Sequence, residues 1–333
     1  MNKEIPTNGL SKIREIDVPG VNVKEFTHLN GDCRLEIILN ETSKVLPVYN
    51  IRNDSNKESI AKALVSGKPV AAFGVGNYGL AVGIDNPRRE RFPDSWKEFW
   101  KFKPVRPHDA HIPILLPPKY WNSIVDFDKI HQGFKGLFTR EKLKKLYYDA
   151  VIFHIVAPTY DFAPHINIPA LITDENGKKS VSAFWWDDPD MEEIADLAMR
   201  LDPFMLIGIS SFNDHGENPA FNYEEVIGYV LKKKKIPFDF IVRDPIGESV
   251  EVKSSHPQFK VPEKGEKPVW KVVRRGSRSV NKFLNATGLQ FEAEGENSAP
   301  YAPRAHSAET NLDNLVDLVH DLTLKDFSRR RAA

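Results

Sequence analysis

The sequence predicts an α/β protein in which amphipathic helices alternate with short, buried strands. Several segments carry apolar residues at helical spacing, and each is followed by a short apolar run that is typical of a buried strand. The chain has 333 residues, of which 41% are hydrophobic, so it can bury a substantial core in one large domain or two modest ones.

The first part of the chain predicts strands and then a helix. RLEIILN (34–40) and KVLPVYNI (44–51) alternate polar and apolar residues as strands do. Ser55 and Glu58 have the spacing of a capping box, in which each side chain hydrogen-bonds a backbone N–H of the first helical turn. The helix that starts there is expected to end near Gly67, before the strand VAAF.

Later segments repeat this alternation. Residues 140–158, 187–211 and 222–244 each predict a helix followed by a strand. The expected apolar faces of the second and third helices consist of Ile194, Leu197, Ala198, Leu201, Val226, Ile227, Val230 and Leu231. A further strand is expected in VWKVVRRG (269–276), after a polar turn.

The charge balance and the hydropathy argue against several classes of protein. Lys and Arg number 46 and Asp and Glu also number 46, so no overall charge draws the protein to nucleic acid or to an anionic membrane. The longest apolar runs, such as FMLIGI (204–209), are too short to span a bilayer, and the N-terminus lacks the apolar core of a signal peptide. The single cysteine, Cys33, suits a reducing compartment, and we expect a soluble, cytoplasmic protein without a membrane partner.

The segment Gly74-x-Gly76-x-x-Gly79 follows the strand VAAF and raises the question of a dinucleotide-binding fold. Such a fold needs the glycine loop to open a helix, because the helix N-terminus binds the pyrophosphate. Here Gly83 and Pro87 follow closely, which argues against a long helix. The sequence therefore predicts another purpose for these glycines.

Four segments, taken in order, resemble the YrdC family of threonylcarbamoyl-AMP synthases and related carbamoyl-adenylate-forming enzymes. They are GKPVAAFGVGNYGLAV, FWKFKPVRPHDAHIPILL, LIGISSFNDHG, and VKSSHPQFK with VWKVVRRGS. The first ends in Tyr-Gly-Leu like the family's opening segment, and the second resembles its Lys-x-Arg-Pro segment. The third resembles its Ser-x-Asn loop, and the fourth its Ser-Thr turn and Arg-x-Gly strand end. The resemblance covers roughly residues 52–285, with VIFHIVAP in the place of the family's central Pro-Leu-Thr strand.

The resemblance implies a twisted mixed sheet with flanking helices and a concave nucleotide-binding cavity. It also implies formation of a carbamoyl-type adenylate from ATP with Mg²⁺ and release of pyrophosphate. The other substrates would be carbamoyl phosphate, or bicarbonate with an amino acid such as threonine. Negative charge grows on phosphate oxygens in such reactions, so fixed cations and N–H donors must surround them. A threonine-using member would act in tRNA modification, with the partners of that process.

The same resemblance assigns the site residues. Lys103 and Arg106 would clamp phosphate, and Ser211 and Asn213 would bind phosphate or the carbamoyl group. These four form the expected catalytic set, although a plain turn after a strand is the alternative for the Ser211 to Asn213 segment. The remaining nucleotide-binding positions would be Ser254, Ser255 and Arg274, and the substrate-binding positions Asn77, Tyr78 and His215. No metal-binding side chain is assigned.

Two departures from the family pattern bear on the substrate. The family's Pro-Thr-Asp-Thr is FGVG here, Phe73 to Gly76, so the groups that would face a small amino acid are absent and the acceptor need not be threonine. The basic pair is spaced by two residues, and Lys101 is an alternative to Lys103. A non-catalytic nucleotide- or RNA-binding module of the same fold is the alternative function.

Two other groups of residues offer alternative sites. His108, Asp109 and His111 have the chemistry of zinc or iron ligands, although loop histidines with ordinary partners are the favoured interpretation. Trp185 and Trp186 have the rings to stack on adenine, but such a pair more commonly packs in a core.

These observations divide the chain into three parts. Residues 1–51 form an N-terminal extension, residues 52–285 the nucleotide-binding domain, and residues 286–333 a loop tether with a C-terminal amphipathic helix. That helix is expected to be capped by Thr310 with Asp313. Its apolar stripe comprises Leu312, Leu315, Val316, Val319 and Leu322. We expect the tether and the helix to close over the nucleotide.

Overall fold

The computed structural model describes residues 10–18, 21–39, 42–74, 77–85, 102, 111–150, 153–160, 171–185, 188–203, 205–213, 219–233, 236, 238–249, 256–274, 280–288, 291–293 and 309–332. No helix in these ranges is long and apolar enough to cross a membrane.

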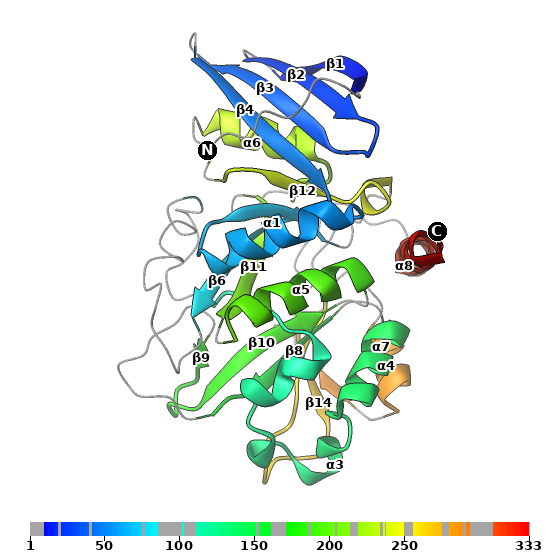
Figure 1. Ribbon diagram of the computed structural model, residues 1–333. Helices are drawn as coiled ribbons and strands as arrows, with labels where there is room; N and C mark the ends of the chain where they lie inside the picture. The colour runs from blue at the N-terminus through cyan, green and yellow to red at the C-terminus, as the bar shows by residue number, and fades with distance from the viewer. Residues whose placement is uncertain are drawn as a thin grey trace.

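One sheet of 15 strands runs through the described part of the molecule (Figure 1). Its strands, in sheet order, are β1 (Leu10–Val18), β2 (Val21–His28), β3 (Cys33–Leu39), β4 (Thr42–Asn50), β12 (Ile241–Arg243), β5 (Val70–Phe73), β6 (Tyr78–Asp85), β11 (Met205–Ser211), β7 (Ile114–Leu115), β10 (Lys179–Trp185), β8 (Phe153–Pro158), β13 (Gln258–Lys260), β14 (Trp270–Arg274) and β15 (Phe291–Ala293), while β9 (Leu171–Thr173) pairs with β10. The sheet is mixed, because β12 runs parallel to β4 and β5 whereas β5 and β6 are antiparallel.

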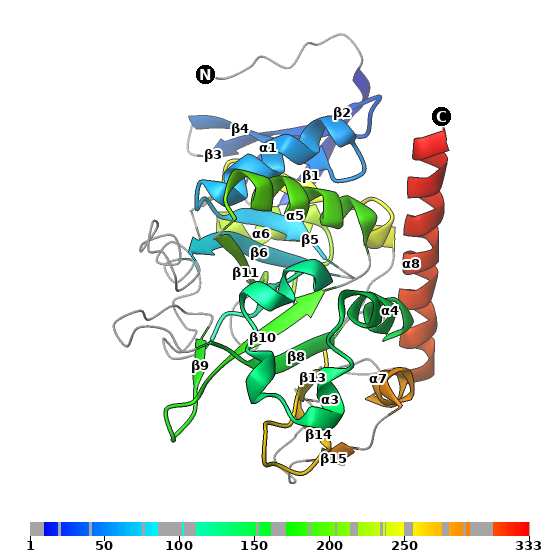
Figure 2. The same ribbon diagram turned by 60° about the horizontal axis from the view of Figure 1, so that its bottom comes forward.

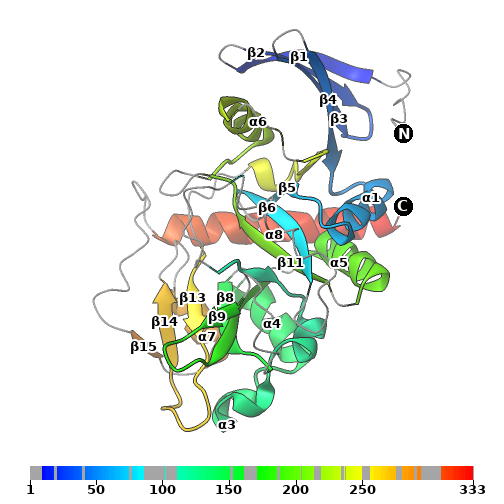
Figure 3. The same cartoon turned by 90° about the vertical axis from the view of Figure 1, so that its left-hand side faces the viewer.

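Helices flank this sheet. They are α1 (Asp54–Val65), α3 (Gln132–Lys135), α4 (Arg140–Ala150), α5 (Pro189–Leu201), α6 (Tyr223–Lys232), α7 (Val280–Thr287) and α8 (Glu309–Ala332), with 3-10 helices η1 (Pro118–Ser123), η2 (Phe127–Lys129) and η3 (Gly247–Ser249). Helices α1 and α5 lie side by side (Figure 2), and α6 lies on the other side of β5 and β6 (Figure 3). The predicted α/β class, a mixed sheet with flanking helices, is confirmed.

The glycine segment belongs to a hairpin. β5 and β6 pair antiparallel, and Gly74 N donates to Asn77 O across 2.8 Å at the turn, so the loop leads into a strand and not into a helix. A Cβ on Gly83 would lie 1.9 Å from the carbonyl oxygen of Leu64, and a Cβ on Gly79 would lie 2.8 Å from the side chain of Ile209. These two glycines therefore allow β6 to approach α1 and β11 closely.

Two expectations about the helices are wrong: the residue that caps α1 and the apolar face of α5. The N-cap of α1 is Asn53, whose side chain accepts from Ser55 N across 3.2 Å, so the predicted cap at Ser55 is wrong by two residues. An asparagine amide oxygen caps a helix as well as a serine hydroxyl does, and Asn53 precedes Ser55 in the chain, so the helix begins after Asn53. In α5, Leu201 is 49% exposed and Met191 and Ala195 are buried instead, whereas the predicted apolar face of α6 is confirmed.

The N-terminal strands are part of the sheet. β1 to β4 form an antiparallel meander whose last strand pairs with β12. Buried Glu25 on β2 accepts hydrogen bonds from Arg14 on β1 and from Tyr223 on α6, across 2.5 Å in the case of Tyr223. Cys33 is buried beside Glu25, and burial raises the pKa of its thiol, which disfavours a nucleophilic thiolate.

Helix α8 runs along one side of the molecule, past α5 and α4 (Figure 2). It begins at Glu309, so Thr310 lies within the helix and is not its cap. Leu322 of the expected apolar stripe is 40% exposed, whereas His320 and Thr323 are buried. Polar partners decide this orientation, since Thr323 Oγ1 accepts from Arg52 across 3.3 Å.

Candidate functional site

Half of the predicted site residues lie in the described part of the chain. Lys103, Arg106, Ser254, Ser255 and His215 fall outside the described residues, as do Lys101, His108, Asp109 and Trp186. The described ones are Asn77, Tyr78, Ser211, Asn213 and Arg274, together with His111 and Trp185. Trp185 is buried in the core, as expected of such a ring.

Ser211 and Asn213 stand together at the end of β11. The Ser211 hydroxyl donates to Asn213 Oδ1 across 2.6 Å, and Asn213 is buried. Between them Phe212 anchors the turn, because its ring packs against Tyr229 and Phe238 and its backbone N–H donates to Tyr78 O across 2.8 Å. The loop thus holds a hydroxyl and an amide in fixed positions beside the start of β6.

Tyr78, the first residue of β6, holds the Ser211 loop in place through buried contacts. Its ring is fully buried, and its hydroxyl donates to Glu248, which Arg243 also binds across 2.7 Å. Burial raises the pKa of the Tyr78 hydroxyl and also that of the Glu248 carboxyl. Tyr78 N donates to Ala220 O across 2.7 Å, so the tyrosine ties the glycine hairpin to both sides of the Ser211 loop.

A second polar group lies on the neighbouring strands. Phe184 on β10 pairs with His154 on β8, His154 pairs with Gln258 on β13, and Gln258 pairs with Arg274 on β14. Residues that pair directly across strands share a face of the sheet, so this row of side chains lies on one face. Ser182, two residues before Phe184, lies on the same face.

These side chains form a hydrogen-bonded chain. Gln258 Nε2 donates to Ser182 Oγ across 2.9 Å, and Ser182 Oγ lies 3.2 Å from His154 Nδ1. The His154 ring stacks on Phe184 with centroids 4.6 Å apart and an interplanar angle of 16°. Ser182 is fully buried, while His154 and Gln258 keep 7% and 6% of their surfaces exposed.

Burial, with the nearby charge of Arg274, keeps His154 neutral. Burial lowers the pKa of His154 well below its usual 6.5, and the charges of Arg274, His256 and His111 lower that pKa further. Arg274 is held in place by its Nε, which donates to His256 O across 3.1 Å. The cluster therefore joins a neutral imidazole to several basic side chains.

His111 links the two groups. It precedes β7, which lies between β11 and β10, and Ile209 N donates to Pro113 O across 2.9 Å. The segment that carries His111 therefore runs beside the end of β11, near Ser211. In the strand order, β7 and β10 lie between β11, which ends at Ser211, and β8, which carries His154.

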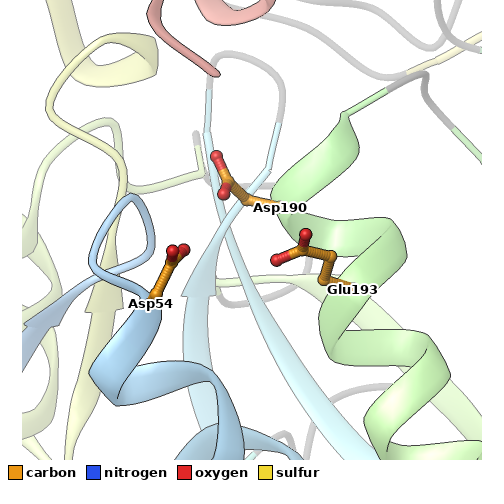
Figure 4. Close-up of side chains that lie close together, drawn as sticks. All are labelled: Asp54, Asp190 and Glu193. Atoms are coloured by element: carbon orange, nitrogen blue, oxygen red, sulfur yellow. The ribbon is translucent and has the colours of Figure 1, made fainter. Parts of the chain in front are cut away.

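Three carboxylates also gather at the start of α1 and α5: Asp54, Asp190 and Glu193 (Figure 4). A cation already occupies their centre, because Lys57 Nζ lies 2.7 Å from Asp54, 2.6 Å from Asp190 and 2.5 Å from Glu193. An ammonium group with three carboxylate partners satisfies the charge that a metal ion would otherwise neutralise. We assign this cluster to the packing of α1 against α5.

Sequence reasoning did not select His154, Ser182, Gln258 or His256. A signal was present, since His154 is a polar residue inside the otherwise apolar FHIVAP, and Ser182 stands among the apolar residues Val181, Ala183 and Phe184. His154, Ser182 and Gln258 are 28 to 104 residues apart in the chain, so no local pattern reveals that they meet. The register of β8, β10 and β13 supplies that information.

No protein-family model and no curated protein sequence matches the chain. Among solved structures, P. abyssi Sua5 complexed with L-threonine is similar over 78% of this chain and 68% of its own, with 16% identity and a TM-score of 0.53. A doubly substituted form of P. abyssi Sua5 aligns over 74% of this chain at 17% identity and a TM-score of 0.48, and the chain spans 65% of its length. E. coli YciO aligns over 71% of this chain and 98% of its own, with 11% identity and a TM-score of 0.47. The resemblance is confirmed at the level of the fold: this chain is a divergent protein with the YrdC-like fold of P. abyssi Sua5.

Proposed function

We propose that the protein forms a carbamoyl-type adenylate from ATP and releases pyrophosphate. A carbamate oxygen would attack the α-phosphorus of ATP, the new P–O bond would form, and the bond to the β-phosphate oxygen would break. The acyl group would then pass from the adenylate to an acceptor. The observation that carries this proposal is the pairing of Ser211 with Asn213 beside the His111, His154 and Arg274 group, on a fold shared with Sua5.

The described side chains suit this chemistry. The transition state gathers negative charge on phosphate oxygens, where Arg274 would provide positive charge and His111 and His154 would provide N–H donors. Ser211 and Asn213 offer a hydroxyl and an amide to orient phosphate or carbamoyl oxygens. Lys103, Arg106, Ser254 and Ser255 are proposed to complete the phosphate site, and Asn77 and His215 to border the substrate. Tyr78, which is fully buried, supports the loop from within the core instead of facing the substrate.

Mg²⁺ would accompany ATP. Oxygen ligands suit this ion, and it usually keeps several waters and binds through one or two side chains and the substrate phosphates. The oxygens of Ser211 and Asn213 fit that requirement. The ion would neutralise phosphate charge, and these two side chains would orient it on the nucleotide.

The identity of the acceptor rests on the glycine hairpin. Glycine and valine at positions 74 to 76 replace the Thr-Asp-Thr of the YrdC pattern, and Phe73, in the place of its proline, is buried and packs edge-on against Tyr78 with centroids 5.1 Å apart. The loss of these hydroxyl and carboxylate groups removes hydrogen bonds that would select a small polar amino acid. The acceptor is therefore proposed to differ from threonine.

The test is pyrophosphate release from ATP and Mg²⁺, with bicarbonate and a panel of amino acids in one set and carbamoyl phosphate in another. Mass spectrometry of the nucleotide products identifies any adenylate. Asn213→Ala should lower the rate at least about a hundredfold, as the loss of a transition-state donor does. Asn176→Ala, in an exposed turn, is the matched control and should leave it unchanged.

The replaced hydroxyl loop also favours a second function, a nucleotide- or RNA-binding module without chemistry. ATP binding measured by calorimetry, with no product from any substrate combination, would support that function over the first. Comparing the affinity for single-stranded RNA with that for ATP would distinguish an RNA-binding module from a nucleotide-binding module.

A further inference from the structure

The imidazole of His154 has one nitrogen engaged and one available. Nδ1 lies 3.2 Å from Ser182 Oγ, and within the described residues Nε2 has no hydrogen-bond partner. The side chain is more than nine-tenths buried and yet retains 7% of its surface. Nε2 is not one of the fully buried atoms that lack a partner, so it belongs to the accessible part of the ring, where a ligand can reach it.

The neighbours of Ser182 determine where the proton of His154 lies. Ser182 Oγ accepts from Gln258 Nε2 across 2.9 Å and is fully buried, and within the described part its only other side-chain partner is His154. A hydroxyl has one proton to donate, and a buried hydroxyl donates it. With the Ser182 proton directed to Nδ1, the other polar neighbour in this chain, Nδ1 is the unprotonated nitrogen.

A neutral imidazole with an unprotonated Nδ1 carries its proton on Nε2. Burial, reinforced by Arg274, His256 and His111, lowers the pKa of His154 well below its usual value, so the ring stays neutral near pH 7. The free end of the ring is thus an N–H donor. The basic groups around it come from β14, from the segment before β13 and from the segment before β7.

We propose that Nε2–H of His154 donates a hydrogen bond to a phosphoryl oxygen of the bound nucleotide, and that Gln258 and Ser182 fix the tautomer that allows it. A donor close to the Arg274 cation selects an anionic acceptor. Because the donor is neutral, it stabilises oxygen charge without needing a proton from solution. His154 is a binding residue in this proposal, and Ser182 and Gln258 are positioning residues.

The inference rests on the proposed nucleotide site but not on turnover. Calorimetric binding of ATP, AMP, pyrophosphate and inorganic phosphate to the full chain measures it directly. His154→Leu should weaken binding of ATP and AMP about tenfold or more. His154→Gln, which can place an amide N–H near the position of Nε2, should recover part of that loss. Weakening for pyrophosphate or phosphate but not for AMP would overturn the nucleotide assignment, and unchanged binding of all four probes would overturn the anion site.

The tautomer has its own signature. Nitrogen-15 NMR of the histidine rings distinguishes Nε2–H from Nδ1–H, and the His154 signals are those that vanish in His154→Gln. We expect Nε2–H in the wild type, and loss of that fixed tautomer in Ser182→Ala. Ser180→Ala, on the same strand and only half-buried, is the matched control and should leave the signals unchanged. An Nδ1–H tautomer in the wild-type protein would contradict the proposal.

The two proposals fail in different ways. If nucleotides bind, His154→Leu weakens them and no adenylate forms, then the catalytic function is wrong and the His154 assignment stands. If an adenylate forms at the wild-type rate and affinity in His154→Leu, the assignment is wrong and the function stands.

Discussion

Arg52 Nη1 donates to Asp190 Oδ2 across 2.7 Å, and both side chains are buried between β4, α1 and α5. The same guanidinium forms ion pairs with Asp188 and Asp244, and Asp190 also forms an ion pair with Lys57. Burial alone would raise the pKa of Asp190, but the hydrogen bonds from Lys57 and Arg52 outweigh it and lower that pKa. The network ties the sheet to the α1 and α5 layer.

Removing one partner from this network should destabilise the fold strongly. Arg52→Ala leaves buried carboxylates without their cation, so the free energy of unfolding should fall by about 3–5 kcal/mol. Urea denaturation measures the change. Lys62→Ala removes the exposed ion pair with Glu58 and serves as the control, with an expected loss below about 1 kcal/mol. Equal losses in the two variants would contradict the assigned role of Arg52.

Gly83 is predicted to tolerate no side chain. Its Cβ position meets the backbone carbonyl of Leu64 at 1.9 Å, so Gly83→Ala must separate β6 from α1. We expect the free energy of unfolding to fall by about 1–3 kcal/mol or more, as in an overpacked core. Gly228→Ala in α6 has nothing within 4 Å and should instead be neutral or stabilising by about 0.5–1 kcal/mol. A melting temperature for Gly83→Ala at or above that of Gly228→Ala would refute the close approach.

His154 should make stability depend on pH. Its pKa in the folded state lies below the usual 6.5, so below that pH the unfolded chain takes up a proton that the folded chain excludes. The free energy of unfolding should therefore decrease as pH falls below about 6.5, by up to about 1.4 kcal/mol per pH unit from this group. His154→Gln should show a shallower slope between pH 6.5 and 5, since His111 and His256 are present in both proteins. Identical slopes would show that His154 titrates normally.

Arg330 should stabilise the docking of α8. It donates to Asp190 Oδ2 and to Arg52 O, each across 2.7 Å, so Arg330→Ala should lower the free energy of unfolding by about 1–3 kcal/mol. Exposed Arg329→Ala is the neighbouring control and should have little effect. Whether α8 also closes over the nucleotide is a separate prediction. Deletion of residues 309–333 with unchanged ATP affinity and turnover would exclude that role.

Local sequence patterns predict most of the helices and strands of this fold. Ser211 and Asn213 were selected from one loop, and the turn between β5 and β6 was separated from a dinucleotide-binding loop by the glycine and proline residues that follow it. Asn53 was missed as a cap because Ser55 and Glu58 offered a competing pattern two residues later. The exposed Leu322 was missed because hydrophobic spacing says nothing of Arg52, which lies far away in the sequence and pairs with Thr323.

The His154 cluster could not be predicted from local sequence patterns, because its members are distant in the chain. Each of His154, Ser182 and Gln258 lies on a different strand, and a single polar residue in an apolar strand has many possible partners. Only the register of the sheet shows that they form one hydrogen-bonded chain. The roles of Lys103, Arg106, Ser254, Ser255 and His215 stay predictions.

The most direct measurement of the central claim is the fate of ¹³C-labelled bicarbonate incubated with the full chain, ATP, Mg²⁺ and a mixture of amino acids, followed by mass spectrometry, with labelled carbamoyl phosphate in a parallel reaction. We predict a labelled adenylate together with pyrophosphate, greatly reduced in Asn213→Ala and unaffected in Asn176→Ala. ATP that binds but stays intact in every combination would contradict adenylate formation and leave a binding module.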